Sequence, residues 1–248
     1  MKGLLPDLLS LSDLKGDLHL HTNWSDGKDS IEDMAKAAQN IGYNYIGITD
    51  HSKLLGIAGG LSEERLLKQI EEIHRLNNKL DDFMIFAGVE VDIRADASLD
   101  FPDDILKCCD FVIASVHSAQ QQDEKTMTAR IIKAIKNPQV DILAHPSGRL
   151  IGEREPYMVD MEAVLEAAKQ TGTILEINAY PARLDLTDIY VRKAKDMGVM
   201  IAINTDAHSC EQLNRMKFGV TVARRGWLEK NDVVNTFDTD SLRFKQPL

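Results

Sequence analysis

Six of the seven histidines in this 248-residue chain follow short apolar segments, and three carboxylates occupy similar positions. The nine residues are His19, His21, Asp26, His51, Glu90, His117, His145, Asp206 and His208. Imidazole nitrogens and carboxylate oxygens bind zinc, manganese and iron, and a buried cluster of such groups would leave polar atoms unpaired without cations. The set therefore predicts a multinuclear metal site.

Two motifs are expected to place pairs of these residues on one face of a strand. His19 and His21 are one residue apart, as are Asp206 and His208, and alternate residues of a strand point to the same side. Either pair alone is weak evidence, because a single histidine at a strand end is more often a hydrogen-bonded core or rim residue. Six histidines with three carboxylates reverse that expectation. His74 lies among charged residues of a helical stretch, and we expect it at the surface.

The elements that must position these residues alternate between apolar strands and amphipathic helices. This rhythm, from Asp17 to about Ser209, predicts parallel strands. We expect strands at 17–21, 45–51, 84–91, 111–117, 141–146, 173–179 and 200–208, of which only 173–179 lacks a predicted ligand. We expect helices from a capping box at 30–33 and from Ser62, at 126–136, 160–170 and 187–197, and a shorter closing element at 231–242.

The spread of ligands over six strands distinguishes two α/β architectures. In a closed barrel the C-terminal ends of all strands converge on one mouth, whereas an open sheet gathers ligands at one switch point. The sequence therefore favours a TIM-like barrel. We expect a single domain, with a lead-in at 1–16, the barrel at 17–209 and closing elements at 210–248.

Composition limits the partners. The 29 basic and 39 acidic residues give a formal net charge of −10, which argues against a general basic surface that grips nucleic acid. Three divalent cations would change −10 to −4, so the site itself could be positive. Three cysteines form neither a disulfide framework nor a metal knuckle, and no apolar stretch reaches the ~20 residues that span a bilayer. These features predict a soluble, cytoplasmic protein without membrane association.

Six segments carry a family resemblance: GDLHLHTNWSDG, GITDHS, GVEVDI, SVHS, AHPSG and NTDAHS. In order and spacing they resemble the motifs of the polymerase and histidinol phosphatase (PHP) family of metal-dependent phosphoesterases. The resemblance implies a distorted seven-stranded (β/α)7 barrel that holds up to three divalent ions of zinc, manganese or iron. It assigns one ion to His19, His21, Glu90 and Asp206, a second to Glu90, His117 and His145, and a third to Asp26, His51 and His208.

Other segments, including AGGLSEERL, HPSGRLIGERE and INAYPARLDL, look most like the PHP domain at the C-terminus of bacterial and archaeal X-family DNA polymerases. There it is associated with 3′-to-5′ exonuclease and related 3′-end phosphoesterase activity, commonly with manganese. We expect no polymerase activity here, because no polymerase domain precedes these motifs. The chain is either an excised fragment or a free-standing relative that could associate with a polymerase.

The predicted chemistry is phosphate ester hydrolysis. A carboxylate that bridges two ions sets them ~3.5–4 Å apart, a spacing that suits in-line displacement at phosphorus, and Glu90 is the expected bridge. Glu90, Asp206 and His208 are the predicted catalytic residues, and Lys53, Arg149 and Arg183 are candidate phosphate clamps or solvated rim charges. Trp24, Tyr157 and Tyr180 could stack on a base, although packing at the rim is expected.

Several functions are compatible with these residues. The leading hypothesis is a phosphoesterase for nucleic-acid 3′ ends or nucleotides, and the alternative is a phosphatase for a small metabolite such as histidinol phosphate. A non-catalytic metal-binding module that contacts a polymerase is a third hypothesis. The intact set of nine ligands weakens it, because a purely structural metal site tends to be closed and small. A deamidase-like metal hydrolase also fits, because a barrel and its metals do not fix the substrate.

Overall fold

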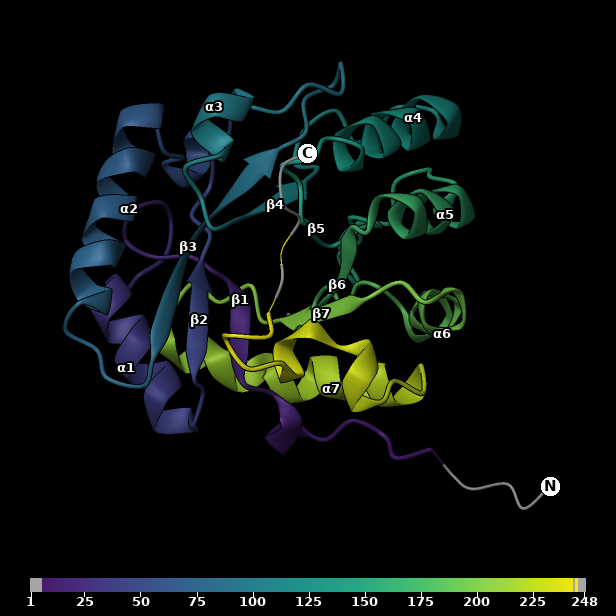
Figure 1. The fold of residues 1–248 in the computed structure, drawn as a ribbon. Coiled ribbons are helices and arrows are strands. Elements are labelled where there is room, and N and C mark those ends of the chain that lie inside the picture. Colours follow the sequence, from purple (N-terminus) through teal and green to yellow (C-terminus); the bar gives the residue numbers. More distant parts are fainter. Residues whose placement is uncertain (1–5, 243, 245–248) are drawn as a thin grey trace.

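A computed structural model describes residues 6–242 and residue 244. In this part of the chain seven parallel strands pair in the order β1 to β7, and helices surround them (Figure 1). The strands are β1 Gly16–Leu20, β2 Tyr45–Ile48, β3 Met84–Asp92, β4 Phe111–Ser115, β5 Ile142–Leu143, β6 Ile174–Asn178 and β7 Ile201–Asn204. This order confirms the predicted α/β fold with parallel strands.

The sheet curves into a nearly closed barrel. A single parallel bridge joins Leu20 to Ala207, just beyond β7, and the Asn204 side chain accepts a hydrogen bond from Leu18 N at 3.1 Å. These links replace a continuous ladder between β1 and β7. The predicted distorted seven-stranded barrel is therefore confirmed.

The helices follow the predicted capping patterns. Ser30 Oγ accepts a hydrogen bond from Asp33 N at 3.1 Å, and Gly42, with φ of 96°, ends the same helix in the left-handed conformation that glycine favours. The helices are α1 Ile31–Ile41, α2 Glu63–Asn77, α3 Asp103–Leu106, α4 Glu124–Ile135, α5 Met161–Thr171, α6 Asp188–Met197 and α7 Met216–Arg225. The 3-10 helices are η1 Leu11–Asp13, η2 Gly56–Ala58, η3 Cys210–Arg215, η4 Lys230–Asp232 and η5 Val234–Thr236.

Two features differ from expectation. Helices α3 and α7 were not expected from the sequence, although several apolar side chains of α7, including Met216 and Val220, are buried. The closing element expected at 231–242 contains only the short 3-10 helices η4 and η5.

No helix in the described residues is long and apolar enough to cross a membrane.

Alternate residues of the strands supply two apolar layers. Val112 and Ala114 of β4 join the large core between the strands and helices, whereas Phe111 and Ile113 join a smaller cluster on the other face of the strand. Val234 and Leu242 from the C-terminal segment complete the smaller cluster.

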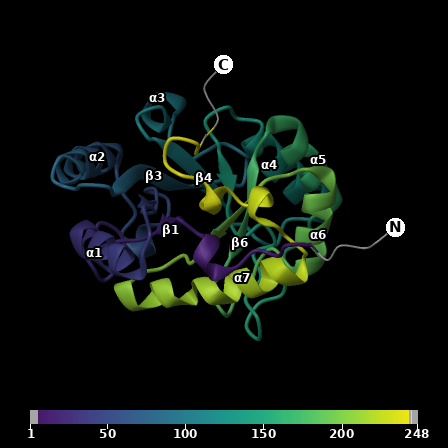
Figure 2. The same cartoon turned by 60° about the horizontal axis from the view of Figure 1, so that its bottom comes forward.

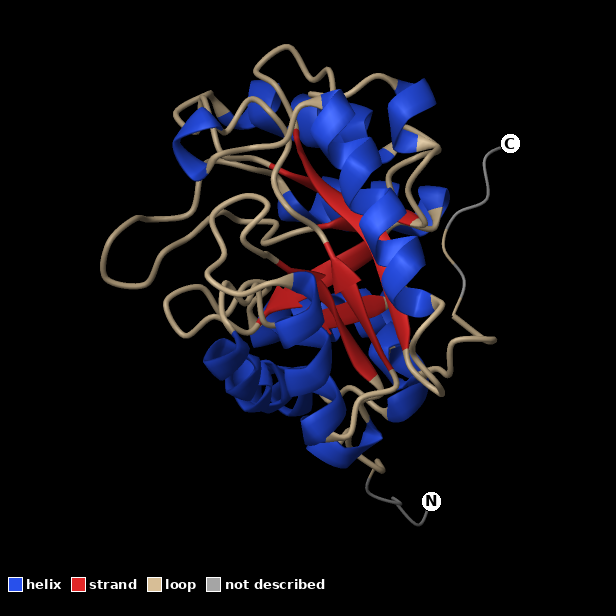
Figure 3. Cartoon of the chain, turned by 90° about the vertical axis from the view of Figure 1, so that its left-hand side faces the viewer, coloured by secondary structure: helices blue, strands red, loops and turns tan. Residues whose placement is uncertain are grey.

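The C-terminal segment closes one end of the barrel, which we call the floor. Its described part crosses the barrel in Figure 2. Phe244 stacks on Phe111, with ring centroids 4.8 Å apart. Figure 3 shows the longer loops gathered on the opposite side, at the C-terminal ends of the strands. This second end is the mouth, where the predicted ligands follow their strands.

Candidate metal centre

Glu90 lies at the centre of the predicted ligands. Its carboxylate oxygens are within 3.6 Å of a ring nitrogen from five different histidines. The distances are 2.7 Å to His51, 3.1 Å to His145, 3.5 Å to His19, 3.5 Å to His117 and 3.6 Å to His21. Glu90 is in β3 and is 2% exposed, so the barrel mouth gathers these side chains around one buried carboxylate.

Two further carboxylates flank this centre. Asp206 Oδ1 is 3.1 Å from His21 Nε2, and Asp26 Oδ1 is 3.3 Å from His208 Nε2. Donor atoms within 4.8 Å of one another form three overlapping groups: His21, Asp26, His51 and His208; His19, His21 and Asp206; and His51, Glu90 and His117. These groups share His21 and His51, whereas the resemblance implied that Glu90 alone is shared.

The expected strand geometry of Asp206 and His208 is wrong. Strand β7 ends at Asn204, so both residues lie in the following loop, and Asp206 has a φ of 53°. His145 also has a positive φ, at 30°, beyond the end of β5. Left-handed backbone is costly for residues with a Cβ and is concentrated at functional sites in proteins. Local backbone strain thus accompanies two of the predicted ligands.

Carboxylates outside the predicted set orient the histidines. Glu176 of β6 lies 2.7 Å from His19 Nδ1 through Oε1 and accepts a hydrogen bond from His145 N at 2.9 Å through Oε2. Asp92 Oδ1 accepts from His117 N at 3.0 Å and lies 3.3 Å from the Nδ1 atom of the same residue. Such partners fix the ring orientation of metal-binding histidines. Sequence reasoning missed both residues, although a glutamate within the apolar strand 173–179 was a usable signal.

Burial and neighbouring charges shift the pKa values of three ligand histidines in opposite directions. Burial lowers the pKa of His21 to about 3 and the pKa of His145 to about 4, so both rings are neutral. Burial also acts to lower the pKa of His51, but Glu90 and Asp26 outweigh it and raise that pKa to about 10. Burial favours the neutral form of Glu90, yet His117, His51 and His19 hold its pKa well below the ordinary range.

The buried donors fit divalent cations. His19 Nε2, both ring nitrogens of His21 and Glu90 Oε2 are buried, and among the described residues their close contacts are with other predicted ligands and lack good hydrogen-bond geometry. Buried polar atoms without well-formed hydrogen bonds are costly, and a cation would satisfy imidazole nitrogens and an ionised carboxylate together. The mixed nitrogen and oxygen set suits zinc, manganese or iron.

The three predicted phosphate clamps lie in different environments. The Arg183 side chain is 13% exposed, its Nε is 3.7 Å from Asp206 Oδ2, and its buried Nη1 lacks a hydrogen-bond partner among the described residues. Arg149 donates through Nε to Arg183 O at 2.7 Å and through Nη2 to Leu184 O, so it supports the loop that carries Arg183. Lys53 is 3.0 Å from Glu63 and 42% exposed.

Two cavities adjoin the centre. The smaller, of about 260 Å³, is lined by Tyr180, Arg183, Asp206, His208, Gln212 and Arg215. The larger, of about 610 Å³, adjoins His117 and is bounded by residues 119–122 and 154–158. Arg215 was missed by sequence reasoning; its guanidinium lies 4.5 Å from the Tyr180 ring centroid, and its Nη1 donates to Gln212 Oε1 at 2.9 Å.

Comparison with known proteins identifies this arrangement. A family model described as the PHP domain matches residues 17–180. The chain belongs to the PHP family. DNA polymerase/3′-5′ exonuclease PolX of Bacillus subtilis strain 168 is 50% identical over 229 residues, which are 92% of this chain and 40% of that protein. This PHP chain therefore spans less than half of that relative.

Other relatives are similar over most of their length. A probable phosphatase of Thermoanaerobacter sp. strain X514 is 34% identical over 89% of each chain. The crystal structure of histidinol phosphate phosphatase from Lactococcus lactis, complexed with zinc, L-histidinol and phosphate, matches with a TM-score of 0.60 and 18% identity, covering 87% of this chain and 95% of that chain. The latter match supports the barrel fold. Family and relatives together identify the PHP chain as a metal-dependent phosphoesterase.

Proposed function

We propose that this phosphoesterase acts on nucleic-acid 3′ ends, using up to three divalent ions held by the nine residues predicted above. The observation that carries the proposal is the convergence of five histidines on the buried Glu90 carboxylate, beside a cavity that contains Arg183. Similarity to PolX over 92% of the chain supports a 3′ end as the substrate. Metal identity and number, together with the residue roles below, belong to this proposal.

Residues at the mouth would have different roles in catalysis. Glu90 and Asp206 would hold the ions, and His208, between Asp26 and the smaller cavity, would complete the catalytic set. When bound, such ions lower the pKa of a water molecule and offset the negative charge that develops on phosphate. The central position of Glu90 among five histidines is the reason for assigning it this role.

Arg183 is the proposed direct phosphate clamp. Its Nη1 has no hydrogen-bond partner among the described residues, and the side chain lines the smaller cavity, where it would donate to a non-attacked phosphate oxygen. Asp206 lies against the same guanidinium. Arg149 would act through the carbonyl contacts that position Arg183. Lys53 would have to leave Glu63 to reach a substrate.

One assay separates the proposed substrate from the alternatives. Protein loaded separately with manganese and with zinc is tested against a 3′-recessed oligonucleotide, a 3′-phosphorylated oligonucleotide, a nucleotide panel and histidinol phosphate. We expect the 3′-end substrates to give the highest kcat/KM. A clear preference for histidinol phosphate would overturn the substrate assignment, and absence of any hydrolysis with two or more ions bound would favour a non-catalytic partner module.

Elemental analysis of chelator-free protein tests the centre itself. We expect up to three equivalents of metal after supplementation, because nine donors meet at one mouth. Less than one equivalent would contradict the proposed centre.

A small-metabolite phosphatase is the second candidate function. Its support is the probable phosphatase that matches this chain over 89% of each sequence, without a large additional region. The same assay distinguishes it from the 3′-end function.

A further inference from the structure

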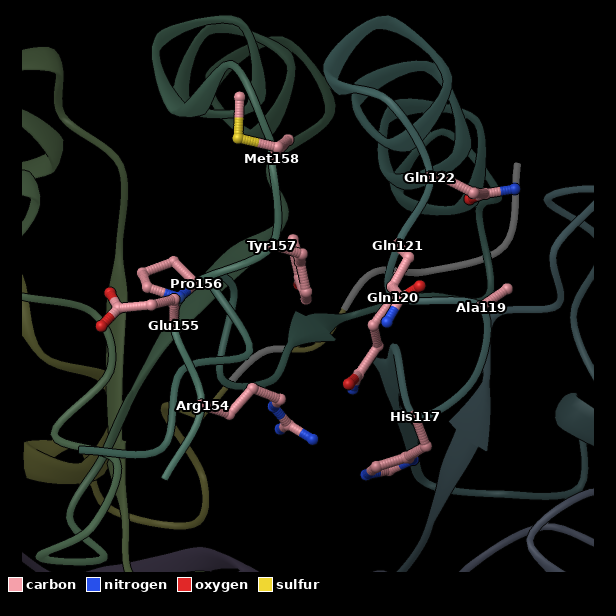
Figure 4. A pocket seen from close by; sticks show the side chains of 10 residues that line it. All are labelled: His117, Ala119, Gln120, Gln121, Gln122, Arg154, Glu155, Pro156, Tyr157 and Met158. Atoms are coloured by element: carbon pink, nitrogen blue, oxygen red, sulfur yellow. The ribbon is translucent and has the colours of Figure 1, made fainter. Parts of the chain in front are cut away.

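The larger cavity at the mouth is too big to serve a phosphate group alone. Its volume of about 610 Å³ lies within the roughly 300–1,000 Å³ that is typical of small-molecule sites. His117 lies at its inner end, and the surrounding walls come from the loop between β4 and α4 and the loop between β5 and α5 (Figure 4). The cavity therefore extends outward from the metal centre.

A buried arginine holds the loop between β4 and α4, which forms the first wall of the cavity. Arg130 of α4 donates through Nη1 to Ser118 O at 3.0 Å, to Ala119 O at 3.4 Å and to Gln122 Oε1 at 3.2 Å. Only 2% of Arg130 is exposed, and Ala119 is held with a φ of 48°. A loop that is held to a helix by several hydrogen bonds is preorganised, as small-molecule sites usually are.

The second wall is tied to the turn that follows β5. Tyr157 Oη donates to Pro146 O at 2.7 Å, and Arg154 donates through Nε and Nη2 to Gly148 O at 3.0 and 2.7 Å. A Cβ atom added at Gly148 would lie 2.2 Å from a carbon of the Tyr157 ring, so the wall packs directly on this turn. The walls are thus positioned by the segments that carry His117 and His145.

The side chains inside the cavity indicate the chemistry of its occupant. Gln120 and Arg154 point toward the space above His117, whereas Glu155 points away (Figure 4). Gln120 donates through Nε2 to Val116 O at 3.2 Å, and its Oε1 accepts no hydrogen bond from the described residues, so that oxygen is available to a ligand.

An arginine and an amide together select against some ligands. The Arg154 guanidinium would repel an ammonium group such as that of an amino alcohol, and it would favour a neutral group rich in acceptors. Arginine and glutamine are also the side chains that pair with the polar edges of nucleobases. Ala119, Pro156 and Met158 add apolar surface to the same cavity.

We propose that this cavity is the subsite for the nucleoside attached to the scissile phosphate, with Gln120 and Arg154 contacting its base. The inference rests on the proposed function at 3′ ends and adds to it a binding site for the terminal nucleoside. It also assigns the selection against cationic metabolites to Arg154.

Calorimetry on the full chain loaded with manganese tests the subsite without measuring turnover. The probes are the four deoxynucleoside 5′-monophosphates and inorganic phosphate. We expect at least one nucleotide to bind at least about tenfold more tightly than phosphate, equivalent to about 1.4 kcal/mol. Gln120→Ala and Arg154→Ala should bring that ratio to about twofold or less.

Matched variants control for general effects. Gln170→Ala on α5 and Arg75→Ala on α2 alter exposed residues of the same types far along the chain, and both should keep the wild-type ratio. Arg154→Lys retains the charge without the planar fork, so it provides a second test if Arg154→Ala fails to fold. A wild-type ratio near one, a ratio that the cavity variants do not change, or a parallel loss of affinity for nucleotide and phosphate would overturn the proposal.

Hydrolysis of bis(p-nitrophenyl) phosphate, which carries no nucleoside, tests the proposed function separately. Hydrolysis of this ester without any nucleotide preference in calorimetry overturns the subsite and leaves the phosphoesterase intact. Failure to hydrolyse any ester overturns the proposed function, and the calorimetric ratio then decides the nucleoside site independently.

Discussion

The two ends of the barrel are built from the same strands, but one end is apolar and the other is polar. Strand β4 begins with Phe111, which packs against Phe244 at the apolar floor, and is followed by His117, which lies 3.5 Å from Glu90 at the polar mouth. Burial of aromatic rings stabilises the floor, whereas burial of charged and unpaired groups destabilises the mouth. The comparison indicates that stability and chemistry are separated along the strand direction, so they should respond differently to substitution.

The largest expected effect is on the floor. Phe111→Ala removes a buried ring from the interior cluster and should lower the free energy of unfolding by about 3–5 kcal/mol. Urea unfolding of the metal-free protein measures this change. Phe218→Ala, at a residue that is 39% exposed on α7, is the control and should cost about 1 kcal/mol or less. A loss below 1 kcal/mol for Phe111→Ala would show that the floor does not carry the stability assigned to it.

Glu90→Gln should have the largest effect on activity at the mouth. It preserves shape but removes the charge at the centre of five histidines, and we expect a loss of at least about 100-fold in turnover, or about 2.7 kcal/mol. Its effect should exceed that of any single histidine substitution, such as His117→Asn. Glu166→Gln, on the exposed side of α5, serves as the control. Retention of more than about a tenth of wild-type turnover would contradict the central role of Glu90.

Glu176→Gln tests the mouth at a residue that orients two of the predicted ligands and is not itself a predicted ligand. The carboxylate contacts His19 Nδ1 and His145 N, so its loss should weaken metal affinity by about 10- to 100-fold, which corresponds to about 1.4–2.7 kcal/mol. Competition with a chromophoric chelator provides the measurement. Unchanged affinity would mean that neighbouring residues orient His19 and His145 without Glu176.

The smallest effects are expected at the phosphate clamp. Arg149→Ala and Arg183→Ala should each reduce kcat/KM about tenfold for a nucleotide and an oligonucleotide alike, and the double variant should lose little more, because Arg149 supports the loop of Arg183. Additive losses would show that the two residues act separately. Oligonucleotide binding should depend weakly on salt in this acidic chain, and a slope equivalent to about six or more phosphate contacts would contradict this.

The sequence allowed the fold to be predicted because each strand carries its own apolar run and most carry a terminal ligand. It did not reveal Glu176 as a partner of His19, because β1 and β6 are far apart in the strand order and approach each other only through barrel curvature. It did not reveal Asp92 as a partner of His117, because that contact depends on the register between β3 and β4 and on the turn after β4. The same limit applies to Arg149, which was interpreted as a clamp and contacts backbone carbonyls 34 and 35 residues away. Helix α7 was missed because its short amphipathic stretch follows directly on η3, with no separate cap motif.

The left-handed backbone of His145 and Asp206 has a consequence for protein engineering. A residue with a Cβ is strained at such a φ, and substitution by glycine relieves strain of this kind. A library of variants screened only for heat resistance would therefore tend to enrich glycine at these two positions and inactivate the enzyme. Thermal screening of this barrel should be paired with a counter-screen for metal content, so that the robust clones retain their ligands.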